Sequence, residues 1–245
     1  MEYTDTDIQA DHLIIPNNKQ IARYVLEFDV PIESDVDNSA GTADLRGTYL
    51  SDYQNLKINL LGREYIVVQA RRSGGNTASS LKLVLMTGET KTTLNQGSKE
   101  TLEVNGKDYE VELTYVDSND RAAFVINGEP TGKINVGDTY HLSDNTKIGV
   151  SNVYYQALET GTKQATFFLG AEDMTLWDTN IVDDHSSKYL YMDGTYMAVK
   201  DARVKIKGSD DNITFKINSI EVNMTAGDDL WVAPGEKLSD IISAR

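Results

Sequence analysis

The chain has 245 residues, which is enough for one large domain or two modest ones, each with its own core. Acidic residues outnumber basic residues 38 to 23, and the net charge of −15 repels nucleic acids and anionic membrane surfaces. There is no cysteine, so disulfides and thiolate metal sites are excluded and stability must come from a packed core.

Short apolar runs recur along the chain between breaks rich in Gly, Asn and Asp. Several alternate strictly between apolar and polar residues, which is typical of strands with one buried and one wet face. No comparable helical periodicity is present, and no stretch approaches the ~20 apolar residues of a membrane-spanning helix. The predicted strands include residues 23–28, 65–68, 81–85, 109–113, 122–126, 165–169, 203–207 and 213–217.

Three dipeptides predict tight turns between these strands. Asn105-Gly106, Asn127-Gly128 and Asp193-Gly194 each follow a β-type run, and such pairs supply the positive φ angles of two-residue hairpins. The sequence therefore predicts an all-β protein of antiparallel sandwich-like or barrel-like domains.

A weak internal repeat has a spacing of 40 residues. The segment 94–97 recurs as 134–137, and Asn105 corresponds to Asn145. This favours two strand–turn–strand units related by pseudo-symmetry. The alternative is that any two hairpins of similar length look alike.

The residues that usually perform catalysis form no recognisable motif. His12, His141 and His185 are far apart in the chain, and no metalloprotease, serine-hydrolase or cysteine nucleophile motif is present. Sugar clefts usually have clustered tryptophans, and this chain has only Trp177 and Trp231. We therefore predict that the protein is not an enzyme and has no catalytic residues.

Calcium is the one cofactor that the sequence suggests. Calcium needs several hard oxygen ligands at flexible spacing, and the candidate ligands are Asp35, Asp37, Asp183 and Asp184. Further acidic turns lie at 117–120, 210–211 and 228–229. The alternative is that all of these are solvated turns, because turns favour Asp and Asn.

Two sequons, at Asn212 and Asn223, are candidate glycosylation sites if the protein is extracellular.

An ordered set of segments resembles a known family. These segments are 59–67, 103–111, 136–144, 148–150 and 167–171, and in this order they are similar to elements of archaeal surface-layer (S-layer) proteins of the methanococcal type and their relatives in small-genome archaea. The resemblance covers about residues 14–171, or about two thirds of the chain.

The resemblance implies a secreted, extracellular β protein that tiles the cell surface as a lattice with copies of itself or with neighbouring S-layer domains. Such proteins are commonly glycosylated and often cation-dependent, and they have no catalytic residues. The chain departs from the full pattern because it lacks a signal and a terminal anchoring region. Its acidic start, Met1 to Asp7, and its abrupt end predict an excised piece.

The resemblance also suggests a layout of one β domain set inside another. Residues 1–53 and 184–245 would form a discontinuous sandwich, in which strand 23–28 pairs with strand 213–217. Residues 54–183 would form the inserted domain.

The main alternative to a structural S-layer role is an extracellular adhesion or carbohydrate-binding module, which an exposed aromatic platform would favour. A secreted hydrolase ranks third.

Overall fold

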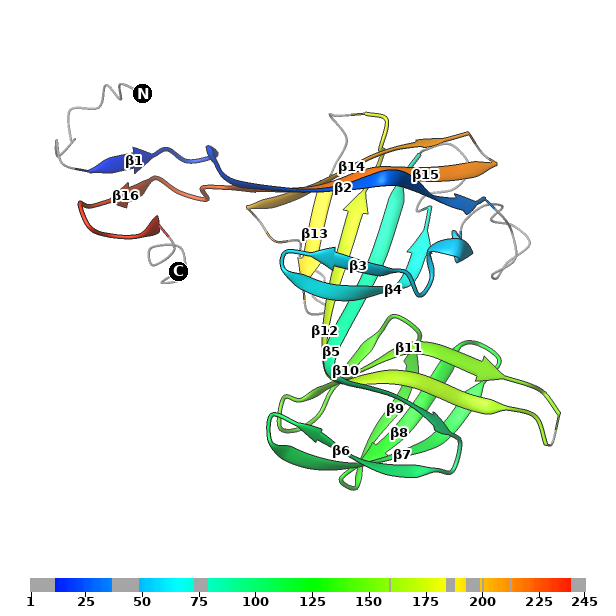
Figure 1. Ribbon diagram of the computed structural model, residues 1–245. Helices are drawn as coiled ribbons and strands as arrows, with labels where there is room; N and C mark the ends of the chain where they lie inside the picture. The colour runs from blue at the N-terminus through cyan, green and yellow to red at the C-terminus, as the bar shows by residue number, and fades with distance from the viewer. Residues whose placement is uncertain are drawn as a thin grey trace.

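A computed structural model describes residues 12–36, 49–72, 79–158, 160–183, 188–192, 199, 201–211 and 213–238. The protein is mostly β and built from antiparallel sheets, which confirms the predicted all-β, sandwich-like class. Figure 1 shows two stacked lobes joined by two long strands, β5 (Leu81–Asn95) and β12 (Lys163–Asp178).

The first lobe is a sandwich of two sheets. One is the three-stranded sheet of β14 (Ala202–Asp210), β15 (Thr214–Thr225) and β2 (Gln20–Asp35). The other combines parts of β12 and β5 with β13 (Lys188–Met192), β4 (Arg63–Arg71) and β3 (Lys57–Leu60). Alternate residues of each strand point inward, so Leu83, Leu176, Ile206, Ile220 and their neighbours form one continuous core.

A 3₁₀ turn, η1 (Ser51–Tyr53), closes one end of this sandwich. Tyr53 is fully buried, and its hydroxyl donates a hydrogen bond of 2.6 Å to the carbonyl oxygen of Phe215. Burial raises the pKa of this phenol far above its usual range, so the hydroxyl stays a donor.

The two long strands stay paired from one lobe into the other, from Leu81 opposite Asp178 to Asn95 opposite Gln164. Two glycines allow their close approach where the lobes meet. A Cβ at Gly88 would lie 2.9 Å from Cβ of Phe168, and Gly170 has a φ of +66°. Larger residues at these positions would clash or be strained.

The second lobe is also a sandwich. Its first sheet contains β10 (Thr139–His141), β11 (Lys147–Tyr155) and the remaining parts of β12 and β5. Its second sheet contains β6 (Lys99–Val104), β7 (Lys107–Asp117), β8 (Arg121–Ile126) and β9 (Glu129–Asn135). The core of this lobe draws on buried residues between Leu94 and Leu169.

The predicted repeat corresponds to two related units of this lobe. The first consists of the end of β5 with β6, β7 and β8, and the second of β9, β10, β11 and β12. The turn after β5 and the turn after β9 each contain a glycine with a positive φ. The N–H of Gly97 donates to the carbonyl of Leu113 at 2.7 Å, and the N–H of Gly137 donates to the carbonyl of Val150 at 2.8 Å. The first strand of each unit pairs with the last strand of the other, as β5 does with β12 and β9 with β8.

Two phenylalanines, one from the last strand of each unit, meet in the core. Phe124 of β8 and Phe167 of β12 are buried, with ring centroids 4.8 Å apart and ring planes tilted by 59°. This tilted arrangement is favourable for aromatic pairs. The contact therefore lies where the two units are joined.

A ribbon of two short strands, β1 (Leu13–Ile15) and β16 (Leu230–Val232), extends away from the first lobe (Figure 1). It continues the pairing of β2 with β15. That pairing was expected, but its register differs, because Arg23 lies opposite Asn223 and Ile32 lies opposite Ile217. The register shifts once between β14 and β15 and twice between β15 and β2.

The predicted division at residues 54 and 183 stays a prediction. The core of the first lobe contains Tyr53 and Leu60, and Leu176 and Leu190, so buried residues from both sides of each predicted boundary pack together. This packing favours boundaries at the glycine bend, near residues 88 and 170, as an alternative hypothesis for the inserted unit.

Candidate functional site

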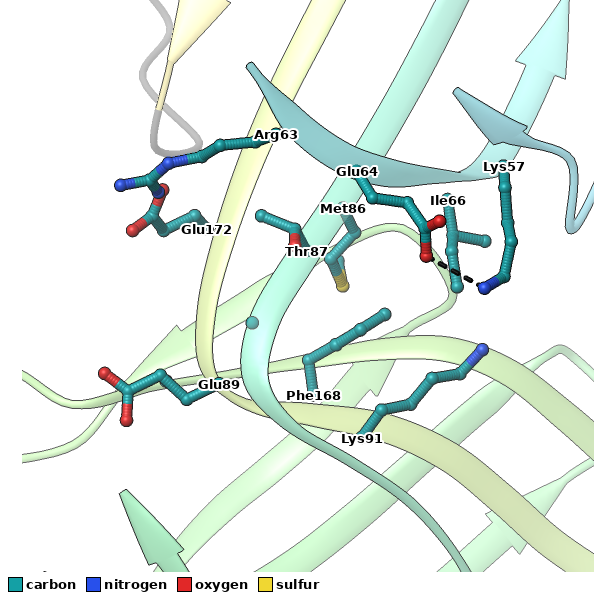
Figure 2. Close-up of a pocket in the computed structure, with 12 residues that line it drawn as sticks. Lys57, Arg63, Glu64, Ile66, Met86, Thr87, Glu89, Lys91, Phe168 and Glu172 are labelled. Atoms are coloured by element: carbon teal, nitrogen blue, oxygen red, sulfur yellow. Dashed lines mark hydrogen bonds and ion pairs between the residues drawn. The ribbon is translucent and has the colours of Figure 1, made fainter. Parts of the chain in front are cut away.

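A cleft of about 610 Å³ lies at the waist, where β5 and β12 pass from one lobe to the other (Figure 2). Its apolar lining consists of Ile66, Met86 and Phe168, which belong to a small buried cluster between the lobes. Thr87, Gly88 and Gly170 also line it, and the remaining lining residues are charged: Lys57, Arg63, Glu64, Glu89, Lys91 and Glu172. We call this feature the waist cleft.

Most of the charges in the waist cleft are already partnered. Lys57 pairs with Glu64 at 2.8 Å and Arg63 pairs with Glu172. Lys91 forms no ion pair with any described residue, and its ammonium lies 5.5 Å from the centre of the Phe168 ring. Burial, followed by the nearby charge of Lys57, lowers the pKa of Lys91.

The three carboxylates that line the waist cleft are all engaged in ion pairs or hydrogen bonds. Glu64 and Glu172 are held by cations, and Glu89 accepts the backbone N–H of Asn105 at 2.7 Å. Lys57 and Lys91 reach toward the same end of the cleft in Figure 2, where the like charge of Lys57 contributes to the lowered pKa of Lys91.

A second feature is the solvent-facing side of the three-stranded sheet. On β14 the apolar residues Ala202, Val204 and Ile206 face the core, so the alternate cationic residues face outward. Arg203 and Arg23 lie on either side of Asn223 across the sheet. The outward cations are Arg23, Arg203, Lys205 and Lys207, and we call this surface the basic face.

Glu221 lies within the basic face and is neutralised there. It is largely buried and accepts hydrogen bonds of 2.6 Å from Arg23 and from Nδ2 of Asn223. The hydrogen bond from Arg23 is the largest of the effects that lower the pKa of Glu221 to about 2. Glu27 of β2 lies in the same row as Lys207, so four cations and two acids share these rows and the face is net positive in a strongly acidic chain.

A third feature is the solvent-facing side of β6 and β7 in the second lobe. Leu102, Tyr109 and Val111 face the core, which leaves the alternate residues outside. Lys99 is the one cation among these paired outward residues, and it bridges Glu110 and Glu112 at 3.2 Å each. The outward acids are Glu103, Asp108, Glu110 and Glu112, and we call this surface the acidic face.

The basic and acidic faces belong to sheets at opposite ends of the molecule (Figure 1). Each face is turned away from the core of its own lobe. One copy therefore presents opposite charges at its two ends.

The predicted calcium ligands lie in the first lobe as far as they are described. Asp35 ends β2, where its N–H donates to Asp52 at 2.9 Å, and Asp183 lies in the turn after β12. Asp37 and Asp184 lie outside the described residues. Among the described residues, no group of three or more His, Asp or Glu side chains is placed to hold a metal, so calcium binding stays a prediction.

Several other acidic turns serve the fold itself. Asp117 pairs with Arg121 at 2.7 Å, and Asp210 pairs with the buried Arg72 at 2.7 Å. Asp211 accepts the N–H groups of Ile213 and Thr214. These contacts match the alternative interpretation of such clusters as turns and internal ion pairs.

Of the two sequons, only Asn223 is described, whereas Asn212 lies outside the described residues. Asn223 is partly exposed on the central strand of the basic face.

The three histidines do not form a described cluster. His12 precedes β1 and His141 ends β10, so these two histidines come from different lobes, and His185 is not described. In the part of the chain that the structure covers, no helix is long and apolar enough to cross a membrane.

Sequence reasoning identified the strands of both charged faces but not the faces themselves. The alternation of Arg203, Lys205 and Lys207 with apolar residues was visible, as was that of Glu110 and Glu112. The location of these faces at opposite ends of the molecule depends on the sheet topology, which no local pattern specifies.

Comparison with known proteins finds no matching family, no matching curated protein and no matching solved structure.

Proposed function

We propose that the protein is a non-catalytic structural component of an archaeal S-layer, which repeats at the cell surface through contacts between copies. The observation that carries this proposal is the location of a basic face and an acidic face at opposite ends of one molecule. The ordered resemblance of residues 14–171 to S-layer proteins gives further support.

Complementary faces at opposite ends favour a head-to-tail contact. Such a contact does not use the same surface on both partners, so it extends into an open array unless the rotation closes a ring. A chain with a net charge of −15 otherwise repels its copies, so the basic face becomes the favoured point of contact. Such a contact would build one row of a lattice, and a second contact between rows would extend it in two dimensions.

Assembly of the purified chain at different salt concentrations tests this proposal. At low ionic strength we expect light scattering to show association and negative-stain electron microscopy to show ordered sheets or filaments. Because exposed charges are screened over about 8–10 Å at 0.1–0.15 M salt, we expect the association to weaken as salt increases.

Charge reversal provides the specific test. Arg203→Glu with Lys207→Glu should abolish assembly, and Glu103→Lys with Asp108→Lys should do the same from the other end. Mixing the two variants should restore association, because each retains a face that complements the other. The matched control for the basic-face variant is Lys19→Glu with Lys237→Glu, which makes the same change in net charge on exposed residues outside both faces. Equal loss in the control, or salt-independent assembly of all variants, would contradict the head-to-tail contact.

A further inference from the structure

Three aromatic rings gather on the solvent-facing side of β12 and β13. Trp177 lies directly across from Tyr189, with ring centroids 5.5 Å apart. Tyr191 lies 6.4 Å from Trp177 and 6.0 Å from Tyr189. All three side chains are partly exposed, and we call this group the aromatic face.

The aromatic face does not belong to the core of the first lobe. The alternate residues Leu176 and Leu190 enter that core, which turns the rings to the opposite side of the sheet. Three large rings that cluster outside the core form an apolar platform, on which the tyrosine hydroxyls remain donors.

Two cations continue the same row across the sheet. Lys82 of β5 lies directly across from Trp177, and Arg71 of β4 lies directly across from Lys82. Adjacent strands are about 4.8 Å apart, so one sugar ring stacked on Trp177 would extend toward Lys82. Neither cation forms an ion pair with any described residue.

The surroundings of Lys82 are short of negative charge. Burial and the neighbouring Arg71 lower its pKa, and only Asp138 of the second lobe opposes this effect. The Nε of Arg71 and the Nε1 of Trp177 are also buried donors with no hydrogen-bond partner in the described structure. Both atoms are covered by their neighbours, so a ligand would contact the partly exposed remainder of these side chains.

Further polar groups border the same area. Thr175 and Gln69 lie in the next row, across from Tyr191 and Val84 respectively. The turn at Gly137 of the second lobe approaches this surface, since a Cβ built there would lie 3.8 Å from Gln69 and Val84. The rings, cations and amide therefore lie beside a wall formed by the other lobe.

We propose that this surface binds an acidic saccharide. The sugar ring stacks on Trp177 and Tyr191, its carboxylate pairs with Lys82 and Arg71, and its hydroxyls reach the polar groups of the next row. A carboxylate is favoured over a neutral sugar because these two adjacent cations form no ion pair with any described residue in a chain of net charge −15. This binding activity is additional to the lattice contact and uses different residues, so either proposal can fail alone.

Tryptophan fluorescence tests the proposal directly, because the chain has only two tryptophans. Trp231→Phe removes the exposed ring of the terminal ribbon and leaves Trp177 as the sole reporter. Titration of this variant with an oligosaccharide of glucuronic acid should give a saturable change in emission. A glucose oligosaccharide of the same length should bind about tenfold more weakly, because it offers no carboxylate to the cations.

Substitutions in the same background separate binding from folding. Lys82→Ala should weaken binding about tenfold and Lys82→Arg should largely restore it, whereas Tyr191→Ala should weaken binding to both saccharides. The matched control is Tyr154→Ala, which removes another exposed tyrosine from β11. Circular dichroism and melting temperature must stay unchanged in each variant. The absence of a saturable change, equal binding of the two saccharides, or an equal effect of the control would each overturn the proposal.

Discussion

Replacement of Lys188 by Met should strongly destabilise the first lobe. The Lys188 ammonium lies 2.9 Å from both carboxylate oxygens of Asp178, whose side chain is fully buried. Asp178 also accepts the N–H of Ile206 at 2.9 Å. This carboxylate therefore connects strands of the two sheets that form the sandwich.

The expected loss of stability follows from the charge of Asp178, which remains buried when Lys188 is replaced. Removing one partner of a buried pair leaves an uncompensated charge, which costs about 3–5 kcal/mol. Methionine keeps the apolar stem of the lysine, so loss of packing contributes little. Equilibrium denaturation followed by circular dichroism should report a correspondingly lower free energy of unfolding for Lys188→Met.

Two comparisons test this reasoning. Adding Asp178→Asn to Lys188→Met should recover part of the loss, because the amide oxygen still accepts the Ile206 N–H without a charge. Breaking the exposed pair of Lys216 and Glu33 by Lys216→Met should cost only about 0–1 kcal/mol. A cost below about 1 kcal/mol for Lys188→Met would refute the argument that the buried charge dominates.

Three further results are expected. Phe124→Ala should cost about 3–5 kcal/mol, and a double-mutant cycle with Phe167→Ala should show coupling of about 0.5–1.5 kcal/mol; additive effects would argue against a direct contact. Because the folded pKa of Glu221 is lowered to about 2, its contribution to stability is present above its unfolded pKa and is lost as the pH falls toward 2. Glu221→Gln should therefore flatten the pH dependence of unfolding below about pH 4.5, and an unchanged profile would contradict this assignment. Calcium should raise the melting temperature by several degrees if a site exists, and identical melts in chelator and in excess calcium would exclude that stabilisation.

The local structure was predictable because its signals are short-range. Asn105-Gly106 and Asn127-Gly128 adopt the positive φ angles that their turns require, and each joins two adjacent strands as expected. Asp193-Gly194 lies outside the described residues. A turn depends on the φ angles of two residues, so the sequence alone specifies it.

The repeat in the second lobe was partly predictable. The matching segments 94–97 and 134–137 form equivalent turns, because the same residues satisfy the same backbone hydrogen bonds. The pairing of each unit with the other could not be read from the repeat. It depends on which apolar faces meet in the core, including those that carry Phe124 and Phe167.

The candidate sites also combine local patterns that the sequence shows with a long-range arrangement that it does not show. No local pattern joins Trp177 to Arg71, which are 106 residues apart in the chain (177 − 71) and come together only because β12, β5 and β4 are neighbours. The tyrosines of β13 were visible as an alternating run, but their shared surface with Lys82 was not. Long-range strand order therefore created a surface that motif searches do not detect.

By itself, the sequence determined the all-β class, the turns, the alternation of buried and exposed residues and the excess of acid, because each depends on residue type or on neighbours in the chain. Only the tertiary structure decided which strands pair, where the lobes bend, and which charges and rings share a surface. These features depend on the burial of apolar faces that are distant in the chain, and several strand orders are compatible with the same alternation.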